Sequence, residues 1–285
     1  MKFLEALGKV DRRIIYLVLA VVIIIPLITT VRMPSLRGLR RTKELFDAVE
    51  SLKGSRKALI ISVDFDPQSM PELYPMLEAV LKHAFSRDIP VIGVGLWPTG
   101  VGLGEQALKE IAKEYNKVYG KDYVFLGYKA PAVAMIMGMG VSIKKTFPVD
   151  NYGIPLDSLP LMQKVKNYKN VGLIVSFSAG SPGYTTWIYY AYTKYGVPVG
   201  AGVTAVSAAD AYPFLPTRQL RGLLTGMKAA AEYENLLKEK GYSYTKPGSF
   251  MRATQSMPAV SGAVLVMMIF VIFANISYFA TRRKK

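Results

Sequence analysis

Two long apolar runs, one near each end of the chain, constrain its fold more than any other feature. Residues 14–31 read IIYLVLAVVIIIPLITTV, and residues 253–281 contain MPAVSGAVLVMMIFVIFANISYFA without a charged side chain. A bilayer core about 30 Å thick is crossed by roughly 20 apolar residues in a helix. The sequence therefore predicts one transmembrane helix in each run, with a globular domain of residues 55–250 held between them.

The positive charge of the chain gathers beside these two runs. The formal net charge is +16 over 285 residues. Cations beside a membrane segment attract anionic lipid headgroups, at about 1 kcal/mol each near the surface. We therefore expect anionic lipids, and not nucleic acid, to be the partner of this charge. The residues concerned are Lys2, Lys9, Arg12 and Arg13 in the tail 1–13, Arg32, Arg37, Arg40, Arg41 and Lys43 after the first run, and the tail 282–285.

The orientation in the membrane follows from a weaker asymmetry. Basic residues are about equally frequent on both sides of the two runs, but large domains cross membranes regardless of charge, whereas short basic tails resist crossing. We expect cytoplasmic tails and an extracytoplasmic domain. The first run is followed by VRMPSLRG and not by a pair of small residues suited to signal-peptide cleavage, so we expect it to remain as an anchor.

The domain between the runs has the pattern of an α/β protein. Residues 32–54 predict a linker and an amphipathic helix with a glycine after its end. Short apolar runs rich in β-branched residues then predict buried strands. Their alternation with helical patterns indicates a mostly parallel sheet with helices on both faces, a three-layer, Rossmann-like sandwich. The expected strands are 57–64, 91–97, 122–127, 171–177 and 197–206, and the expected helices are 71–86, 104–119, 131–140, 184–195 and 217–240.

Three residues suggest assembly. Gly222 and Gly226 lie in the helix predicted over 217–240, where small residues permit close approach of a neighbouring element. Asn275 is a polar side chain within the second apolar run, where it is suited to bond with another membrane helix. We expect a homo-oligomer or a subunit of a membrane complex.

The first candidate for chemistry is Asp64-Phe65-Asp66, directly after the first predicted strand. Two carboxylates with one residue between them can chelate Mg²⁺ or act as nucleophile and general acid. An apolar run followed by D-x-D resembles the first motif of haloacid-dehalogenase-type phosphatases, in which the leading aspartate is the nucleophile. The chain continues Pro67-Gln68-Ser69, where that family usually has Gly and Thr or Val, and the family's acidic pair is missing. The other motifs match only loosely, to Ser176 or Ser178, Lys194 and Asp210. The alternative is that Asp64 and Asp66 cap a turn or the next helix.

A second candidate is the stretch SFSAGSPG, between a strand and a helix. Ser178, Gly180, Ser181 and Gly183 form the type of loop whose backbone amides hold an anion at a helix N-terminus. Asp210 follows the next strand and can face the same crevice. A cap and turn without a ligand is the alternative, as it is for the glycine-dense stretch around Trp97.

The composition argues against several kinds of enzyme. The chain has no cysteine and one histidine, His83, which we expect on the polar face of its helix. One histidine and no cysteine are too few ligands for a typical zinc site and leave only His83 for a Ser-His-Asp triad. The motif G-x-S-x-G does not occur either. We therefore expect a membrane-anchored binding or scaffolding module, non-catalytic and without a cofactor. The alternatives are a Mg²⁺-dependent, phosphatase-like hydrolase using Asp64 and Asp66, and a transport-associated receptor.

Overall fold

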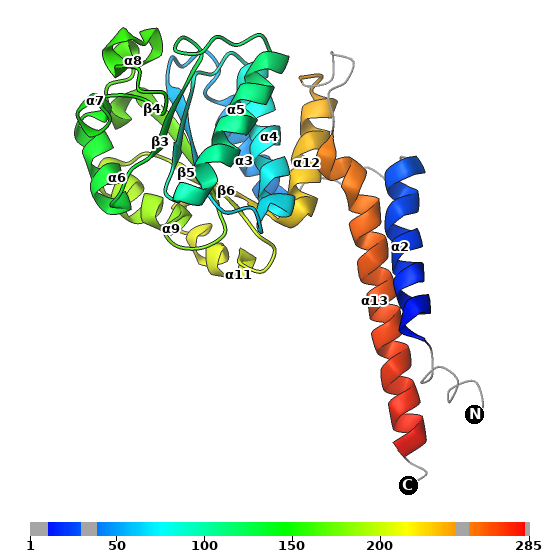
Figure 1. Ribbon diagram of the computed structural model, residues 1–285. Helices are drawn as coiled ribbons and strands as arrows, with labels where there is room; N and C mark the ends of the chain where they lie inside the picture. The colour runs from blue at the N-terminus through cyan, green and yellow to red at the C-terminus, as the bar shows by residue number, and fades with distance from the viewer. Residues whose placement is uncertain (1–10, 30–38, 243–250, 283–285) are drawn as a thin grey trace. The chain divides into compact units, whose positions relative to one another are not determined.

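The computed structural model describes residues 11–29, 39–242 and 251–282. The chain divides into two compact units (Figure 1). One comprises Met1–Ser35 and Thr254–Lys285, and the other comprises Leu36–Ala253. The second unit contains the sheet and every candidate site except Asn275.

Within the described residues of this unit, six strands form one all-parallel sheet in the order β3-β2-β1-β4-β5-β6. This is the strand order of doubly wound, Rossmann-like folds, so the predicted fold class is confirmed. Five of the strands match the predicted runs. The strands are β1 (Ala58–Asp64), β2 (Val91–Gly95), β3 (Tyr123–Tyr128), β4 (Val171–Ser178), β5 (Val199–Val203) and β6 (Leu220–Thr225).

Helices cover both faces of the sheet (Figure 1). One layer contains α3 (Arg40–Glu50), α4 (Met70–Ser86), α5 (Val101–Glu114) and α12 (Gly226–Glu239). The other contains α6 (Ala132–Val141), α7 (Ile143–Thr146), α8 (Pro160–Lys164) and α9 (Tyr184–Trp187), which continues through the π-helix η4 (Ile188–Tyr192) into α10 (Thr193–Tyr195). Short helices in the connections are η1 (Pro98–Gly100), η2 (Leu156–Ser158), η3 (Tyr168–Asn170), α11 (Ala208–Ala211) and η5 (Tyr212–Phe214).

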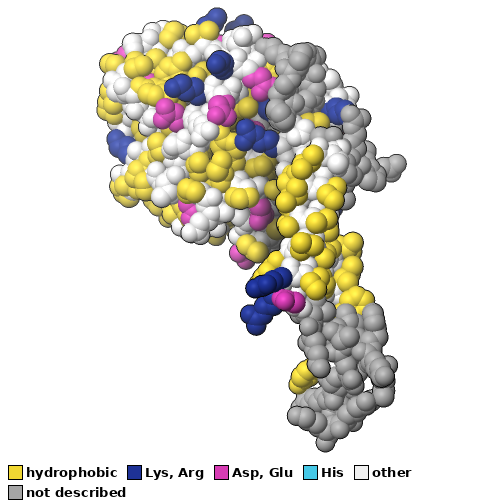
Figure 2. All heavy atoms as spheres, turned by 45° about the vertical axis from the view of Figure 1, so that its right-hand side comes forward, with side chains coloured by type: hydrophobic (Ala, Val, Ile, Leu, Met, Phe, Trp, Pro, Cys, Tyr) yellow, Lys and Arg dark blue, Asp and Glu magenta, His cyan; other side chains and the backbone are white. Residues whose placement is uncertain are grey.

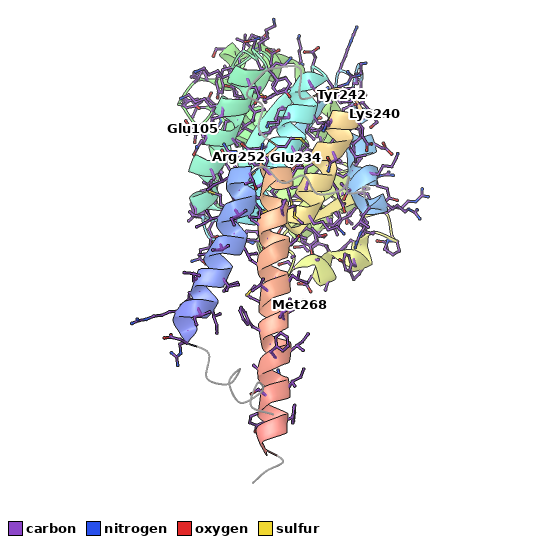
Figure 3. The ribbon with its side chains drawn as sticks, turned by 90° about the vertical axis from the view of Figure 1, so that its right-hand side faces the viewer. Glu105, Glu234, Lys240, Tyr242, Arg252 and Met268 are labelled. Carbon is purple, nitrogen blue, oxygen red and sulfur yellow. The ribbon has the colours of Figure 1, made fainter. Side chains whose placement is uncertain are left out.

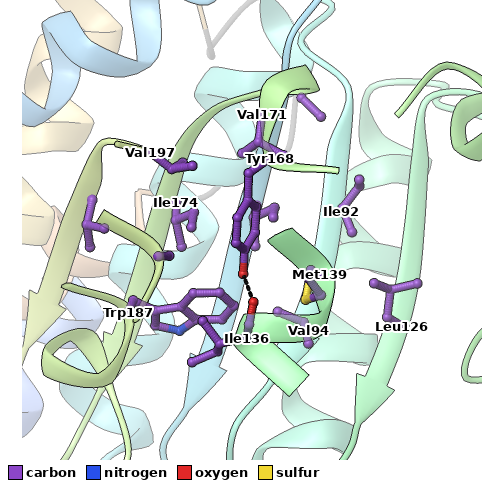
Figure 4. Close-up of a cluster of buried hydrophobic side chains, with 14 of the residues drawn as sticks. Ile92, Val94, Leu126, Ile136, Met139, Tyr168, Val171, Ile174, Trp187 and Val197 are labelled. Carbon is purple, nitrogen blue, oxygen red and sulfur yellow. Dashed lines mark hydrogen bonds between the residues drawn. The ribbon is translucent and has the colours of Figure 1, made fainter. Parts of the chain in front are cut away.

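The core on the α6–α9 side of the sheet is built around Trp187 and Tyr168 (Figure 4). Strands β1, β2 and β5 are buried along their whole length, as expected of strands covered on both faces. The Tyr168 hydroxyl donates a 2.7 Å hydrogen bond to the carbonyl oxygen of Ile136. This bond satisfies the one polar atom of a side chain that is otherwise surrounded by hydrophobic groups.

Helix α3 is the predicted amphipathic helix, and it packs on the α/β unit. Its apolar residues Leu45, Phe46 and Val49 are buried against β6 and α12. Its first turn is capped from α12: a side-chain oxygen of Glu232 accepts hydrogen bonds from the Leu39 backbone N–H (3.1 Å) and the Thr42 hydroxyl (2.8 Å). A carboxylate at a helix N-terminus satisfies free N–H groups and interacts favourably with the helix dipole.

The cations of α3 that we assigned to lipid are already engaged within the protein. Arg40 pairs with Glu44 at 2.8 Å and Lys43 with Asp47 at 2.5 Å, both one helical turn apart. The Arg41 guanidinium lies over the Tyr212 ring, 4.5 Å from its centroid. The other basic positions of the tails and linker, at 2, 9, 32, 37 and 283–285, lie outside the described residues.

The helix predicted over 217–240 is wrong in its first third. Residues Leu220–Thr225 form the edge strand β6, and α12 begins only at Gly226. A leucine-rich run of six residues fits either a strand or a buried helix turn, and in the structure this run pairs with β5 as a strand. A Cβ added at Gly222 would lie 2.2 Å from the Leu45 backbone nitrogen, and Gly226 has φ +62°. Both glycines therefore have roles within one chain.

The expectation for His83 was also wrong. Its side chain is fully buried, hydrogen-bonded at 2.8 Å to the Tyr233 hydroxyl and at 2.8 Å to Glu50, and stacked on Phe46. Burial lowers the pKa of His83 to about 4, although the neighbouring Glu50 carboxylate acts in the opposite direction. The imidazole is a neutral part of the packing among α3, α4 and α12.

The other unit contains α2 (Arg12–Thr29) and α13 (Arg252–Arg282), the two helices among the described residues that are long and apolar enough to cross a bilayer. Their exposed side chains are mainly hydrophobic (Figure 2). The helices approach closely where a Cβ on Gly262 would lie 2.7 Å from a Val22 methyl group. The Asn275 side chain donates to the Val271 carbonyl of its own helix at 2.8 Å, which gives it a partner without a second chain.

Within the α/β unit, charged side chains of α4 and α12 contact the first residues of α13. Arg252 lies 3.3 Å from Glu78 of α4, and Glu234 of α12 accepts the Ala253 backbone N–H at 3.1 Å (Figure 3). Burial raises the pKa of Glu78 to about 7, against the opposing attraction of Arg252 and Lys82. The carboxyl of Glu78 therefore titrates near neutral pH.

Candidate functional site

In a doubly wound sheet the connections leave to opposite faces at the point where the strand order reverses, and ligands bind outside the carboxyl ends of the strands there. In this protein that point lies between β1 and β4. Their pairing sets Ser62 beside Ser176 and Asp64 beside Ser178. Since side chains alternate along a strand, these four polar groups share one face at the end of two otherwise apolar strands.

Asp64 is the centre of this polar group and is completely buried. One carboxylate oxygen accepts hydrogen bonds from the Ser62 hydroxyl (2.6 Å) and the Leu96 backbone N–H (2.8 Å), and the other accepts from the Ser176 hydroxyl (2.6 Å). The Asp64 carbonyl oxygen accepts the Ala179 N–H at 3.2 Å. Asp64 thus ties together β1, β4 and the loops that follow β2 and β4.

Burial raises the pKa of Asp64 to about 6, whereas the three hydrogen bonds favour the charged form and act against this rise. The Trp187 indole N–H lies near enough to favour the charged form as well. It nevertheless meets no acceptor at hydrogen-bonding geometry among the described residues. At neutral pH Asp64 is therefore a carboxylate, and its hydrogen bonds offset only part of the cost of burying the charge.

The structure does not bring Asp64 and Asp66 together as a chelating pair. Asp66 caps the turn before α4, with one oxygen accepting the backbone N–H groups of Gln68 and Ser69, each at 3.2 Å. Asp64 faces the interior. Among the described residues no group of three or more acidic, histidine or cysteine side chains is arranged to hold a metal ion. The turn-capping alternative describes Asp66, whereas the Asp64 side chain is fully buried in this structure.

Trp97, in the loop after β2, links that loop to the SFSAGSPG loop. The Trp97 indole N–H donates to the Pro182 carbonyl at 2.7 Å, and a Cβ on Gly180 would lie 3.5 Å from the ring. At Gly183 a Cβ would approach the Ser178 side chain to 2.6 Å and the Gly180 carbonyl to 2.5 Å, so this position requires glycine. The loops after β2 and β4 are thus hydrogen-bonded to each other and to Asp64.

Several amides of the predicted anion nest are already satisfied within the loop. The Tyr184 N–H donates to the Ser178 hydroxyl (3.4 Å), and the Gly183 N–H donates to the Thr186 hydroxyl (3.3 Å). Ser178 is buried, while Gly180 and Ser181 are exposed. Of the four predicted residues, only these two present their backbone and hydroxyl groups to solvent.

Asp210 is exposed on α11 and lies on the same side of the sheet as Tyr184. Burial raises the pKa of Tyr184, and the negative charge of Asp210 raises it further. We call the side chains of Tyr189, Val206, Tyr212 and Phe214, which belong to the segments that follow β4 and β5, the aromatic rim; Phe214 is half-buried and the other three are exposed. Tyr189 and Tyr184 both contact the Phe214 ring, with centroids 6.4 and 6.0 Å apart. Val206 is 88% exposed and Tyr189 56% exposed.

Sequence reasoning missed Ser62, Trp187 and the rim. The period-two patterns S-x-D at the end of β1 and S-x-S at the end of β4 carry the signal for the buried polar group. The rim has no such signal, because exposed tyrosines cannot be distinguished from core tyrosines without the fold.

Comparison of the chain with protein-family models, with curated proteins and with solved structures finds no match in any of the three. The functional argument therefore depends on this geometry alone.

Proposed function

We propose that the chain is a membrane-anchored α/β module that binds a protein partner, a second copy of itself or a subunit of a membrane complex, through the carboxyl edge of its sheet. The observation that carries the proposal is the aromatic rim. Exposed large apolar side chains that gather beside polar loops are typical of protein interfaces, in which tyrosine is enriched.

The chemistry of the same edge supports binding and not turnover. Asp64 is sealed beneath the loops, and the groups that face solvent are tyrosine rings, the Ser181 hydroxyl, loop backbone and the Asp210 carboxylate. An aromatic centre with a polar border is the usual composition of a binding surface. The module holds a partner and positions it beside the membrane.

We further propose that α2 and α13 both span the bilayer, with anionic lipid around the basic flanks. The tails then lie in the cytoplasm and the α/β unit outside it. Because the chain has no cysteine, single cysteines at the exposed position 113 and at position 285 report topology without background. An impermeant thiol reagent added to intact cells is expected to label position 113 and to spare position 285. The reverse pattern would invert the topology.

The rim is tested on the full chain in lipid nanodiscs. Mass photometry at rising protein concentration is expected to show self-association that the Tyr189→Lys, Val206→Lys double variant abolishes. A photo-crosslinking residue at position 206 reports a heterologous partner as a discrete adduct in native membranes. Val118→Lys is the matched control, because Val118 is 55% exposed but lies at the opposite edge of the sheet.

Two results together would contradict the proposal: a wild-type monomer at every concentration, and no adduct from position 206 beyond that obtained from position 118.

A further inference from the structure

A cavity of about 600 Å³ opens at the amino edge of the sheet, opposite the aromatic rim. Residues from the segments that lead into four neighbouring strands line it: Arg56 two residues before β1, and Pro90, Asp122 and Asn170 directly before β2, β3 and β4. Small-molecule sites in proteins usually occupy about 300–1,000 Å³, so this cavity has the size of one.

The floor of the cavity is apolar. Ile89, Leu161 and Val165 line it, and each is at least 96% buried in the protein; Pro90 completes the surface. Such a floor offers the apolar part of a ligand van der Waals contacts, and these side chains contain no polar group that would lose its water on binding.

The border of the cavity is basic. Arg56, Lys117, Lys121 and Lys164 lie around it, together with Asp88 and Asp122. Lys117 is mostly buried and pairs with Asp88. An oxygen of Asp122 accepts the Val118 backbone N–H at 2.8 Å.

The other three cations have no such partner. Within the described part of the chain, no carboxylate lies within 4.0 Å of Arg56, Lys121 or Lys164. Positive groups that converge on a concave surface repel one another and raise the local concentration of anions. An anion with more than one negative charge, placed between them, relieves this repulsion.

The backbone at Arg56 adds a second observation. Its φ is +60°, a left-handed conformation that glycine adopts readily and a long side chain does not. Non-glycine residues held in this region gather at ligand sites, where the surrounding structure fixes them. An arginine at this position places a guanidinium beside the cavity at the expense of backbone strain.

We propose that this cavity binds an organic phosphate, with its apolar part on the floor and its phosphate group between Arg56, Lys121 and Lys164. Guanidinium and ammonium groups form charge-assisted hydrogen bonds with phosphate oxygens, and the three cations match a dianion better than a monocarboxylate. The site is independent of the proposed partner surface, because the two lie at opposite edges of the sheet.

The test is isothermal titration calorimetry on the full chain in nanodiscs of neutral phosphatidylcholine, which offers no competing anionic lipid. The probes are inorganic phosphate, phenyl phosphate and a short-chain, water-soluble phosphatidic acid. We expect phenyl phosphate to bind more tightly than inorganic phosphate because of the apolar floor. If phosphatidic acid binds more tightly still, the source of the phosphate is a lipid headgroup; if phenyl phosphate binds more tightly, it is a soluble metabolite.

Two variants and one control identify the site. Lys121→Gln with Lys164→Gln is expected to weaken phenyl phosphate binding at least tenfold, since each charge-assisted bond contributes about this factor. Arg56→Gly is expected to weaken binding without lowering the melting temperature, because glycine relieves the strain. Lys53→Gln with Lys109→Gln removes two exposed cations that do not line the cavity, and it is expected to leave binding unchanged. The proposal is overturned if none of the probes binds at millimolar concentration, or if the cavity double variant binds as tightly as the control.

Discussion

Replacing Asp64 by asparagine is the most direct test of the conclusion that burying the Asp64 charge costs stability. Burial raises the pKa of Asp64 from 3.8 to about 6. A group whose pKa is higher in the folded state binds protons more tightly there, so stability is lost as the pH rises from about 4 to above 6. At about 1.4 kcal/mol per pKa unit, the charged form is less favourable in the folded protein by about 3 kcal/mol.

Asparagine keeps the shape of the side chain and removes the titration. Its oxygen can accept from the Leu96 N–H and the Ser62 hydroxyl, which now bond the same Asp64 oxygen, and its amide can donate to the Ser176 hydroxyl. We expect Asp64→Asn to be more stable than the wild type by about 1–3 kcal/mol at pH 8, and to be equally stable below pH 4. For a domain of this size that is about 2–4 °C in melting temperature per kcal/mol.

The assay is thermal unfolding of the full chain in detergent between pH 4 and pH 8, followed by near-ultraviolet circular dichroism. Asp64→Ala is the control, because it removes the acceptor and leaves three buried donors unpaired. It is expected to lose about 2–5 kcal/mol at pH 4, and less at pH 8, where the wild type carries the cost of the buried charge. A lower melting temperature for Asp64→Asn at pH 8, or melting curves for variant and wild type that stay parallel from pH 4 to pH 8, would refute the reasoning. The first result would mean that the charge stabilises the fold, and the second that ionisation of Asp64 does not affect stability.

Four further outcomes follow from the packing and the charge cluster. The pKa of Glu78 is raised by burial to about 7, so its protonation stabilises the fold below pH 4.5 and this contribution is lost by about pH 7. Glu78→Gln is expected to flatten the corresponding part of the stability profile in urea titrations. Gly222→Ala forces a Cβ against the backbone of α3 and is expected to lower stability by about 2 kcal/mol or more. Gly102→Ala, where a Cβ in α5 meets nothing within 4 Å, is expected to raise stability by up to about 1 kcal/mol. Cysteines at Val22 and Gly262 are expected to form a disulfide in mild oxidant, seen as a mobility shift that reductant reverses; absence of the shift would contradict the helix pair.

Most of the fold was predictable because the local signals were consistent with one another. Where such runs alternate with amphipathic helices, an apolar, β-branched run such as ALIISVD indicates a buried strand. Five of the six strands were predicted in this way. The sixth strand was not predicted, because LRGLLT has no β-branched residue before its last position. Its conformation depends on pairing with β5 and on the close approach of α3 at Gly222, both of which are contacts between residues far apart in the sequence.

The site was predictable in part. The rule for parallel sheets drew attention to Asp64 and Ser178, and the structure places these residues at the ends of β1 and β4. The sequence could not indicate that Asp64 turns inward, because this depends on hydrogen bonds from Ser176 on another strand and from the loop after β2. For the same reason His83 was assigned to a polar face, although Glu50 and Tyr233 provide its partners in the interior.

The contact of Glu232 with Leu39 and Thr42 has a mechanical consequence. Glu232 belongs to the last helix of the α/β unit and its two partners to the first, so the incoming and outgoing ends of this unit are fastened to each other. A stretching force applied to both ends of the unit acts on these two hydrogen bonds before it acts on the six strands. The outer helices are therefore expected to yield first and the sheet to survive the initial extension, since units at the periphery of a fold open at lower free energy than its centre.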